Sequence, residues 1–592
     1  MERNSSEAPD RSRLLERLPE HRVGATTQDA SRIGGRRAAT PAHETSQPAP
    51  SLTSLSHSSE VIKLFRNGRR RSVPLVAMVA AGALLAACAT GSGTDGKGPS
   101  GKAPSDKALT IGIIGGVPNL DPINANNLTV DESVRPVYDN LVDFDSSGEL
   151  TGRLATKWTT SPDGKSINFT LRDDAKFHDG APVTSDDVAF TLDRIKALGI
   201  GVASKLTQYE STTVSDPTHF TIRLSSPSSI FLGALNRVYV LNSKLVKSHL
   251  GTDNAQGWLA SAGAGSGPYT LEEYTANSQI VYRTNPDYVG NANPKRAQVV
   301  VYRLLDSNAT AQNQLLSGAI QVATGVPLAQ LAQFQGNSKF EVALIPDRLL
   351  TVIYFNTQKG LTANPEIRRA IRLAYDYDAH TESILRGHAN VASGILTPQT
   401  DCRADLATAK QNLDESKALF AKAGASDATL TLSFQPGIAE LASGAELLQS
   451  SLAKIGVTLK LVPNAFPAYL QMLASPATTP DLAISWFSQP DPNPGSTLNP
   501  QFNSKYVGTG SNFSQFSNPE VDKLLSEAVA SSDPDLQCAN FKKVQEIVDE
   551  QAVVLPIAYQ QRVYISTPNV TGVDITHPGH DGQFHPAHYG FN

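Results

Sequence analysis

The stretch with the clearest chemical meaning is Leu85-Ala86-Ala87-Cys88, which ends a short apolar run. Small residues before a cysteine permit cleavage by a signal peptidase, and lipid chains on Cys88 would then hold the mature chain on a membrane. The run from 73 to 87 is too short to span a bilayer as a helix, and a basic flank precedes it. The stretch therefore predicts a lipoprotein signal. An ordinary N-terminal anchor with an incidental Cys88 is the alternative.

The segments around this signal differ in composition from a folded domain. Residues 1–60 are rich in Ser, Thr, Pro, Arg and Glu, which predicts a disordered extension or a translation start that truly lies near Val61. Residues 61–87 are the predicted signal peptide. Residues 88–107 are rich in Gly, Ser, Lys and Pro, which is typical of a flexible tether. The folded part is therefore expected to begin at residue 108.

Two further cysteines, Cys402 and Cys538, complete the three in the chain. If Cys88 carries lipid, they remain as a potential pair in an oxidising compartment. A disulfide between them would contribute up to about 4–5 kcal/mol in the chain-entropy model. Two buried free thiols are the alternative, because spacing alone does not decide pairing.

A metal-binding protein is one competing function. Histidine clusters can ligate nickel or zinc, and four of the 12 histidines lie near the end of the chain, namely His577, His580, His585 and His588. Proline and glycine interrupt this segment, and the histidines show no fixed ligand spacing. We therefore expect no structural metal and no cofactor.

A secreted hydrolase is the competing function from the enzyme class. The Gly-x-Ser-x-Gly elbow is not formed around Ser266, because Ala264 stands at the first glycine position. The chain also has no His-Glu-x-x-His motif. We therefore expect no catalytic residue.

The composition limits the partners of the folded part. Removal of 87 residues leaves 505, more than one hydrophobic core usually serves, so at least two lobes are expected. Residues 73–592 contain 38 Lys and Arg against 48 Asp and Glu, which argues against a nucleic-acid partner. No apolar run of about 18 residues follows Cys88, so no membrane-spanning helix is expected there.

The elements that would position a site follow an α/β pattern. A strand at 430–434, a helix at 441–455 and a strand at 457–461 predict one βαβ unit with parallel strands. A further strand at 481–486 runs into Gln489-Pro490-Asp491-Pro492-Asn493-Pro494-Gly495, which continues no regular element. Ligands of open α/β sheets bind at such exits.

Shorter signals mark other elements. The apolar run 109–114 predicts a buried first strand, and alternation over 167–171 predicts a half-buried one. Thr184 with Asp187 predicts a capped helix start. Proline after a capping residue predicts two late helices, beginning at Pro519 and Pro534.

The order and spacing of several motifs resemble one protein family. The strongest matches are Leu154-Ala155-Thr156-Lys157-Trp158, Ser161-Pro162-Asp163-Gly164-Lys165, Phe177-His178-Asp179-Gly180, Thr184-Ser185-Asp186-Asp187-Val188, Gly265-Ser266-Gly267-Pro268-Tyr269 and Asn285-Pro286-Asp287-Tyr288. On these motifs the chain is identified as a member of the family 5 extracellular solute-binding proteins of ABC importers, the oligopeptide- and dipeptide-binding type. The resemblance covers nearly everything from Ala108 onward.

The resemblance implies an α/β fold of the two-lobed periplasmic-binding-protein class (class II, the large peptide-binding type) with two hinge strands. Lobe I would hold about residues 108–346 and 559–592, and lobe II about residues 347–558. The implied role is to capture oligopeptides, dipeptides or a related small solute between closing lobes and deliver it to the ABC transporter permease. A nickel complex or another non-peptide solute is the alternative. We expect a monomer, lipid-anchored outside the cytoplasm.

Most motif residues are better explained as structure than as ligand contacts. Asp163-Gly164 and Asp179-Gly180 suit turns, and Asp187 suits a helix cap. The ligand contacts are expected instead at Asn119, Phe466, Tyr469, Trp486, Phe487, Gln489, Asp491 and Tyr559. Aromatic walls bury the apolar parts of a ligand, and one carboxylate among them can hold a cation. Some of these rings are equally expected to belong to the core.

One departure from the family pattern lies in this group. Peptide binders of the family often carry an aspartate three residues after the tryptophan equivalent to Trp486, where it pairs with the peptide's α-amino group. Gln489 occupies that position here. A neutral amide cannot supply the charge-assisted bond, so either Asp491 does so or the ligand is not an ordinary peptide.

Overall fold

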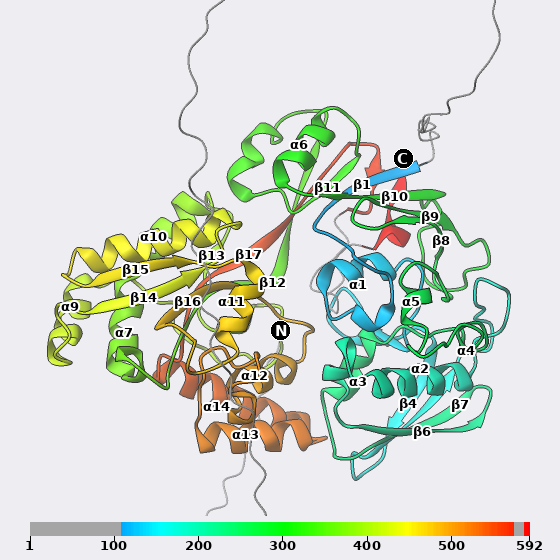
Figure 1. Ribbon diagram of the computed structural model, residues 1–592, viewed down its shortest axis with the longest axis horizontal. Helices are drawn as coiled ribbons and strands as arrows, with labels where there is room; N and C mark the ends of the chain where they lie inside the picture. The colour runs from blue at the N-terminus through cyan, green and yellow to red at the C-terminus, as the bar shows by residue number, and fades with distance from the viewer. Residues whose placement is uncertain (1–107, 574–584) are drawn as a thin grey trace, which may run out of the picture. The chain divides into compact units, whose positions relative to one another are not determined.

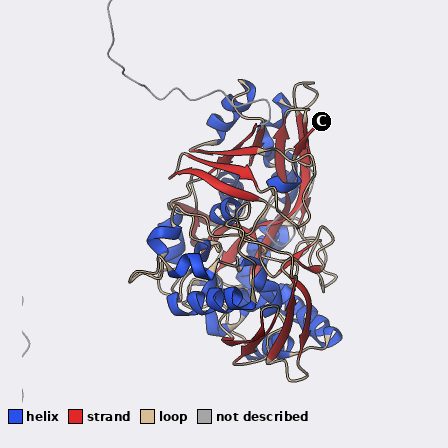
Figure 2. Ribbon diagram, turned by 90° about the vertical axis from the view of Figure 1, so that its right-hand side faces the viewer, coloured by secondary structure: helices blue, strands red, loops and turns tan. Residues whose placement is uncertain are grey.

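The computed structural model describes residues 108–573 and 585–592. The predictions for residues 1–107, including Cys88 and the tether, lie outside the described residues, as do those for His577 and His580. The described chain has the expected two-lobed α/β fold, in which helices and strands are interleaved (Figure 1, Figure 2). The lobe boundaries after 346 and 558 stay predictions.

One mixed sheet of 11 strands forms the framework. From edge to edge its strands are β15 (Thr458–Pro463), β14 (Thr429–Phe434), β16 (Leu482–Ser488), β12 (Glu341–Phe355), β17 (Val554–Ser566), β11 (Val322–Thr324), β1 (Ala108–Ile114), β10 (Val299–Leu305), β9 (Gln279–Thr284) and β8 (Tyr269–Thr275). A short strand, β13 (Asn390–Val391), also pairs with β17. The apolar run predicted as the first strand is β1, which is parallel to β10 and β11.

Two long antiparallel strands, β12 and β17, lie at the centre of this sheet (Figure 1). Their pairing extends from Glu341 opposite Ser566 to Tyr354 opposite Val554. The register shifts twice, between Pro346 and Leu350 and again between Thr351 and Val352. Such irregularities bend a strand and increase its twist. These two strands are the pair that the fold class requires as its hinge.

The predicted βαβ unit is confirmed. It consists of β14, α10 (Ala439–Ala453) and β15, and the strands are parallel from Thr429 opposite Thr458 onward. The apolar face of α10 is fully buried through Leu441, Ala445, Leu448 and Leu452. The predicted strand at 481–486 is β16, which continues to Ser488.

The motif residues near the N-terminus form turns and caps, as predicted. A four-stranded antiparallel sheet is ordered β4 (Ala155–Thr160), β5 (Ser166–Leu171), β7 (His219–Leu224), β6 (Tyr209–Asp216). Gly164 makes the turn between β4 and β5 with φ of 66°, a conformation that glycine adopts without strain. Thr184 and Asp187 form the capping box of α2 (Ser185–Leu198).

The remaining helices cover the sheets. They are α1 (Leu128–Val134), α3 (Phe231–Ala234), α4 (Ser243–Lys247), α5 (Gln256–Leu259), α6 (Asn308–Leu316), α7 (Pro365–Ala374), α8 (Tyr377–Ala379), α9 (Leu413–Lys422), α11 (Phe466–Leu473), α12 (Pro494–Phe502), α13 (Pro519–Ala530) and α14 (Pro534–Glu550). Asn518 and Asp533 cap α13 and α14 just before their first prolines, as predicted. Within residues 108–573 and 585–592, no helix combines the length and apolarity that a membrane crossing needs.

Alternating side chains of β12 enter two different hydrophobic clusters. Ile353 and Phe355 pack in a cluster with α7 and α10, whereas Val352 and Tyr354 pack in a cluster with α12, α13 and α14. Successive side chains of a strand point to opposite faces, so this part of the sheet has helices on both faces. The polar residues of β12 and β16 therefore lie among mainly apolar side chains.

A buried ion pair fixes the loop that follows β1. The Arg194 guanidinium, on α2, donates two hydrogen bonds to the Asp121 carboxylate, at 2.6 and 3.1 Å. The two side chains are only 3% and 2% exposed. The Asp121 carboxylate also accepts from the backbone N–H of Ile123. This pair holds the turn that carries Asn119 against lobe I.

Arg194→Met is expected to destabilise the protein by about 3–5 kcal/mol, because it leaves the Asp121 carboxylate buried without its cation. Urea unfolding monitored by circular dichroism measures the loss. The control is Arg283→Met, which removes an ion pair with Glu272 whose side chains are 57% and 40% exposed; it should cost less than about 1 kcal/mol. Equal losses in the two variants would contradict the assignment.

Candidate functional site

Gln489 is the first residue after β16 and is completely enclosed by protein. Its Nε2 donates to the Ile395 carbonyl at 3.0 Å, and its Oε1 accepts from the hydroxyls of Thr397 and Thr400. Its backbone N–H donates to the Arg348 carbonyl at 2.9 Å. The side-chain amide and the backbone N–H of Gln489 thus hold segment 395–400 against β12. The amide is occupied within the protein, and a role of Gln489 in ligand binding stays a prediction.

Asp491 lies two residues further along the same loop and is also buried. Its carboxylate accepts from the backbone N–H of Asn493 at 2.9 Å, next to the start of α12. Burial raises the pKa of the Asp491 carboxyl, opposed by a hydrogen bond from Ser496 and by the charge of Lys205. This carboxyl therefore stabilises the turn between β16 and α12.

Trp486 lies near the end of β16 and remains 39% exposed. Its indole Nε1 donates to Oε2 of Glu440 at 2.8 Å. Glu440 is in the first turn of α10. Trp486 therefore has an exposed ring whose N–H is held by a nearby carboxylate.

Three more side chains surround the same carboxylate. Oε1 of Glu440 accepts from the Thr351 hydroxyl at 2.6 Å, from Gln560 Nε2 at 2.6 Å and from His380 Nε2 at 3.3 Å. Burial opposes ionisation of Glu440, but the hydrogen bond and electrostatic attraction of His380, with hydrogen bonds from Thr351 and Gln560, outweigh it and lower the pKa of the carboxyl. The group that we call the Glu440 cluster, Glu440 with Trp486, Thr351, Gln560 and His380, thus stabilises a negative charge inside the fold.

The Tyr559 side chain, on β17, makes contacts within the protein. Its hydroxyl donates to the Gly394 carbonyl and accepts from Arg403, both at 3.1 Å. The Arg403 guanidinium also lies 5.5 Å from the centre of the ring. Tyr559 is 7% exposed, so it fastens segment 394–403 to the hinge strand.

The other predicted contact residues differ in accessibility. The Asn119 side chain is half-buried and accepts from the backbone N–H of Asp121 and from Asn124 Nδ2. Tyr469 is fully buried, with its hydroxyl donating to the Ile484 carbonyl at 2.9 Å. Phe487 is half-buried and packs against the cluster that includes α12, α13 and α14, whereas Phe466 is 56% exposed. Asn119, Tyr469 and Phe487 thus make internal contacts, and their roles in binding stay predictions.

Segments assigned to different lobes by the predicted boundaries are in contact. The backbone N–H of Ser229 donates to the Val529 carbonyl at 2.7 Å, and Asn493 Nδ2 donates to the Ser229 carbonyl at 3.5 Å. Ser229 precedes α3, whereas Asn493 caps α12 and Val529 is in α13. The segment before α3 therefore contacts α12 and α13.

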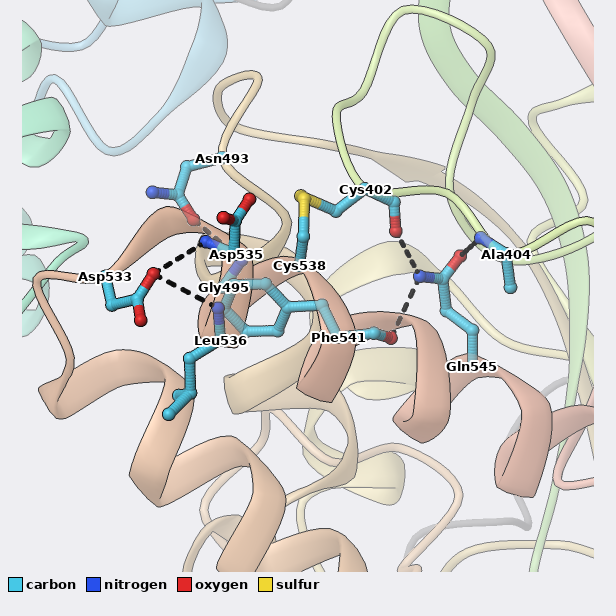
Figure 3. The surroundings of a disulfide bond; sticks show 10 residues. All are labelled: Cys402, Ala404, Asn493, Gly495, Asp533, Asp535, Leu536, Cys538, Phe541 and Gln545. Atoms are coloured by element: carbon cyan, nitrogen blue, oxygen red, sulfur yellow. Dashed lines mark hydrogen bonds between the residues drawn. A yellow bond between two sulfur atoms is a disulfide. The ribbon is translucent and has the colours of Figure 1, made fainter. Parts of the chain in front are cut away.

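A disulfide joins Cys402 to Cys538, with their Cα atoms 4.9 Å apart. Figure 3 shows Gln545 bridging the same region: its Nε2 donates to the Cys402 carbonyl at 2.8 Å, and its Oε1 accepts from the Ala404 N–H at 3.1 Å. The bond ties the end of the segment that contains Thr397, Thr400 and Arg403 to α14. The disulfide thereby helps to fix segment 395–400, which encloses Gln489.

The described part of the chain contains no group of three or more His, Cys, Asp or Glu side chains that could hold a metal ion. The rings of His585 and His588 lie edge to face, 5.7 Å apart, and His585 accepts from the backbone N–H of Ala587. Burial lowers the pKa of His588 to about 4. His577 and His580 lie outside the described residues.

Sequence reasoning found Trp486 but missed its partners. Glu440, His380, Thr351 and Gln560 come from four segments spread over residues 351–560. One signal was present: Glu440 follows the strand-to-helix exit after β14, the type of position where α/β proteins place ligand groups. Nothing local in the sequence marks the other three residues.

A protein-family model matches residues 149–509, with the description "Bacterial extracellular solute-binding proteins, family 5 Middle". The chain is 31% identical over 457 residues to a protein of Escherichia coli named "Probable D,D-dipeptide-binding periplasmic protein DdpA". That match covers 75% of this chain and 87% of the relative. The similarity therefore extends over most of both proteins.

Two solved structures share the fold. One is the periplasmic binding protein DppA from Helicobacter pylori in complex with the peptide STSA, with a TM-score of 0.68, 23% identity, and coverage of 80% of this chain and 97% of that one. The other is NikZ from Campylobacter jejuni in complex with Ni(L-His), with a TM-score of 0.72, 19% identity, and coverage of 82% and 100%. At these identities the likeness shows the fold alone.

Asp491→Asn is expected to raise stability at neutral pH. Because burial raises the pKa of this carboxyl in the fold, its contribution is complete below the unfolded pKa of about 3.9 and is lost as the pH rises through the folded pKa. The amide keeps the acceptor for Asn493 without the charge. Urea midpoints at pH 7 and pH 3 should therefore show a gain at pH 7 that disappears at pH 3.

Asp163→Asn is a control for which the expected change in stability at pH 7 has the opposite sign. A hydrogen bond from the Ser161 hydroxyl, followed by one from the Lys165 N–H, lowers the pKa of this exposed carboxyl. Its stabilising contribution is present above the unfolded pKa and is lost as the pH falls. Asp163→Asn should therefore lower stability at pH 7. A pH-independent effect of Asp491→Asn would contradict the first expectation.

Proposed function

Because the chain belongs to the bacterial extracellular solute-binding proteins of family 5, we propose that it captures a dipeptide, an oligopeptide or a related small solute and delivers it to the permease of an ABC importer. The observation that carries the proposal is the long pairing of β12 with β17 at the centre of the sheet, with Trp486 39% exposed on the neighbouring strand β16. A solute enclosed there would contact both lobes. The peptide-binding names of the relatives support this substrate class.

The hinge supplies the mechanism of capture. A receptor whose closed form binds the solute more tightly is shifted toward closure by binding. A shift from mostly open to mostly closed needs about 5.5 kcal/mol of differential affinity. The contacts of Ser229 with Val529 and Asn493 are of the kind that form only when the lobes are together. Closure then presents the permease with a surface that the open form lacks.

The location and state of the protein complete the proposal. The lipid on Cys88 would hold the protein on the outer side of the cytoplasmic membrane, with residues 88–107 as its tether. The protein acts as a monomer and turns over no substrate. The nearby relative from E. coli is named as periplasmic, in keeping with this placement.

Native mass spectrometry of the gently purified full chain tests the proposal. We expect a solute of a few hundred daltons that is retained under native conditions and released after mild unfolding. A ladder of masses that fragment as peptides would support peptide import, and one defined mass would identify a specialised solute. A chain that carries no solute and gains none from a peptide digest would contradict the proposal.

Cys88→Ser is expected to release the protein from the membrane fraction, because the thiol that carries the lipid is lost. Immunoblots of membrane and soluble fractions measure the distribution. Cys402→Ser is the control, since this cysteine forms the disulfide with Cys538 and should not alter membrane attachment. Retention of Cys88→Ser on membranes would contradict lipid anchoring at this residue.

A further inference from the structure

The Glu440 cluster surrounds a buried carboxylate with hydrogen-bond donors. Four side chains donate to the carboxylate. In the part of the chain that the structure describes, His380 is the one basic residue paired with it. The Glu440 side chain is only 10% exposed. A buried carboxylate is costly unless hydrogen bonds or a cation offset its lost hydration.

His380 connects the Glu440 carboxylate to a buried tyrosine. Its Nδ1 lies 2.8 Å from the Tyr375 hydroxyl, and its Nε2 lies 3.3 Å from Oε1 of Glu440. The imidazole is fully buried. Both of its ring nitrogens are therefore used within the fold, and neither is left for a solute.

The exposed ring of Trp486 lies at the edge of this cluster. Oε1 of Glu440 accepts three hydrogen bonds, whereas Oε2 accepts one, from Trp486. An ionised carboxylate behind the indole N–H adds to the negative potential that an aromatic face already carries. The 39% of Trp486 that is exposed is therefore an attractive surface for a cation. A carboxylate oxygen can accept two hydrogen bonds, so Oε2 can accept one more.

The other candidate anchors for a cationic group are occupied. Gln489 is neutral and enclosed, with its amide bound to Ile395, Thr397 and Thr400. The Asp491 carboxyl is buried and accepts from Asn493. Neither presents a charge to a solute in this conformation.

We propose that the solute carries an ammonium group, and that this group docks on the face of Trp486 with Glu440 behind it. This inference rests on the proposed function and adds the residues that select the charge of the solute. The ammonium can be the α-amino group of a peptide or the side-chain amine of a lysine. In either case the carboxylate of Glu440 attracts the cationic amine, which the neutral amide of Gln489 cannot do.

Isothermal titration calorimetry on the full chain separates these sources. The probes are tri-alanine, N-acetyl-tri-alanine, N-acetyl-Ala-Lys-Ala and its Nε-acetylated form. We expect the protein to bind at least one probe with a free amine at least tenfold more tightly than its acetylated partner. Preference for tri-alanine assigns the α-amino group, and preference for the lysine probe assigns the side chain.

Three variants connect the preference to the cluster. Glu440→Gln should reduce the preference for the free amine at least tenfold while changing the affinity for the acetylated probe less than twofold. Trp486→Leu should do the same, and Trp486→Phe, which keeps a ring but loses the indole N–H, should fall between. Glu446→Gln is the control, because Glu446 is an exposed carboxylate on the same helix, α10; it should leave the preference unchanged.

The possible failures are distinguishable. Equal binding of free and acetylated probes would overturn the ammonium site and leave the proposed function intact. Absence of binding for all four probes, together with no co-purified solute, would overturn both. A co-purified solute without a basic group would overturn the inference alone. Thermal melting of each variant identifies loss of folding, and if Glu440→Gln does not fold, the two Trp486 variants decide the outcome.

Discussion

The antiparallel pairing of β12 with β17 is the constraint on which the rest of the structure depends. The two strands have 15 and 13 residues and lie at the centre of the 11-stranded sheet. Most residues of the two strands are buried, and an unpaired buried N–H or C=O costs as much as a lost hydrogen bond. The pairing of β12 with β17 is interrupted at the register shifts between 346 and 352.

The same two strands also supply much of the candidate site. Thr351 from β12 and Gln560 from β17 donate to Glu440, and Tyr559 from β17 holds segment 394–403 through Gly394 and Arg403. The Arg348 carbonyl, within the register shift, accepts from Gln489. The central strand pair and the candidate site therefore share the contacts of Gln489 and of Glu440.

Glu440 and Asp491 are two buried carboxyls whose pKa values shift in opposite directions. Desolvation disfavours the ionised form of Glu440, but His380, Thr351 and Gln560 outweigh it and lower the pKa. Burial outweighs the partners of Asp491, and its pKa is raised. The carboxyl with the lowered pKa is beside the exposed ring of Trp486, and the one with the raised pKa is inside a turn.

The sequence by itself determined the local elements and the family. The βαβ unit around α10, the capping box of α2 and the proline-started helices α13 and α14 could be predicted because their hydrogen bonds join residues close in the chain. Trp486 could also be placed at a strand end by its neighbours alone. Only the tertiary structure decided that Gln489 is enclosed, that Cys402 meets Cys538, and that Glu440 gathers Thr351, His380 and Gln560. Those contacts join segments as much as 136 residues apart, and no local pattern encodes them, because burial and hydrogen bonding between distant segments arise only when the sheet has brought its strands together.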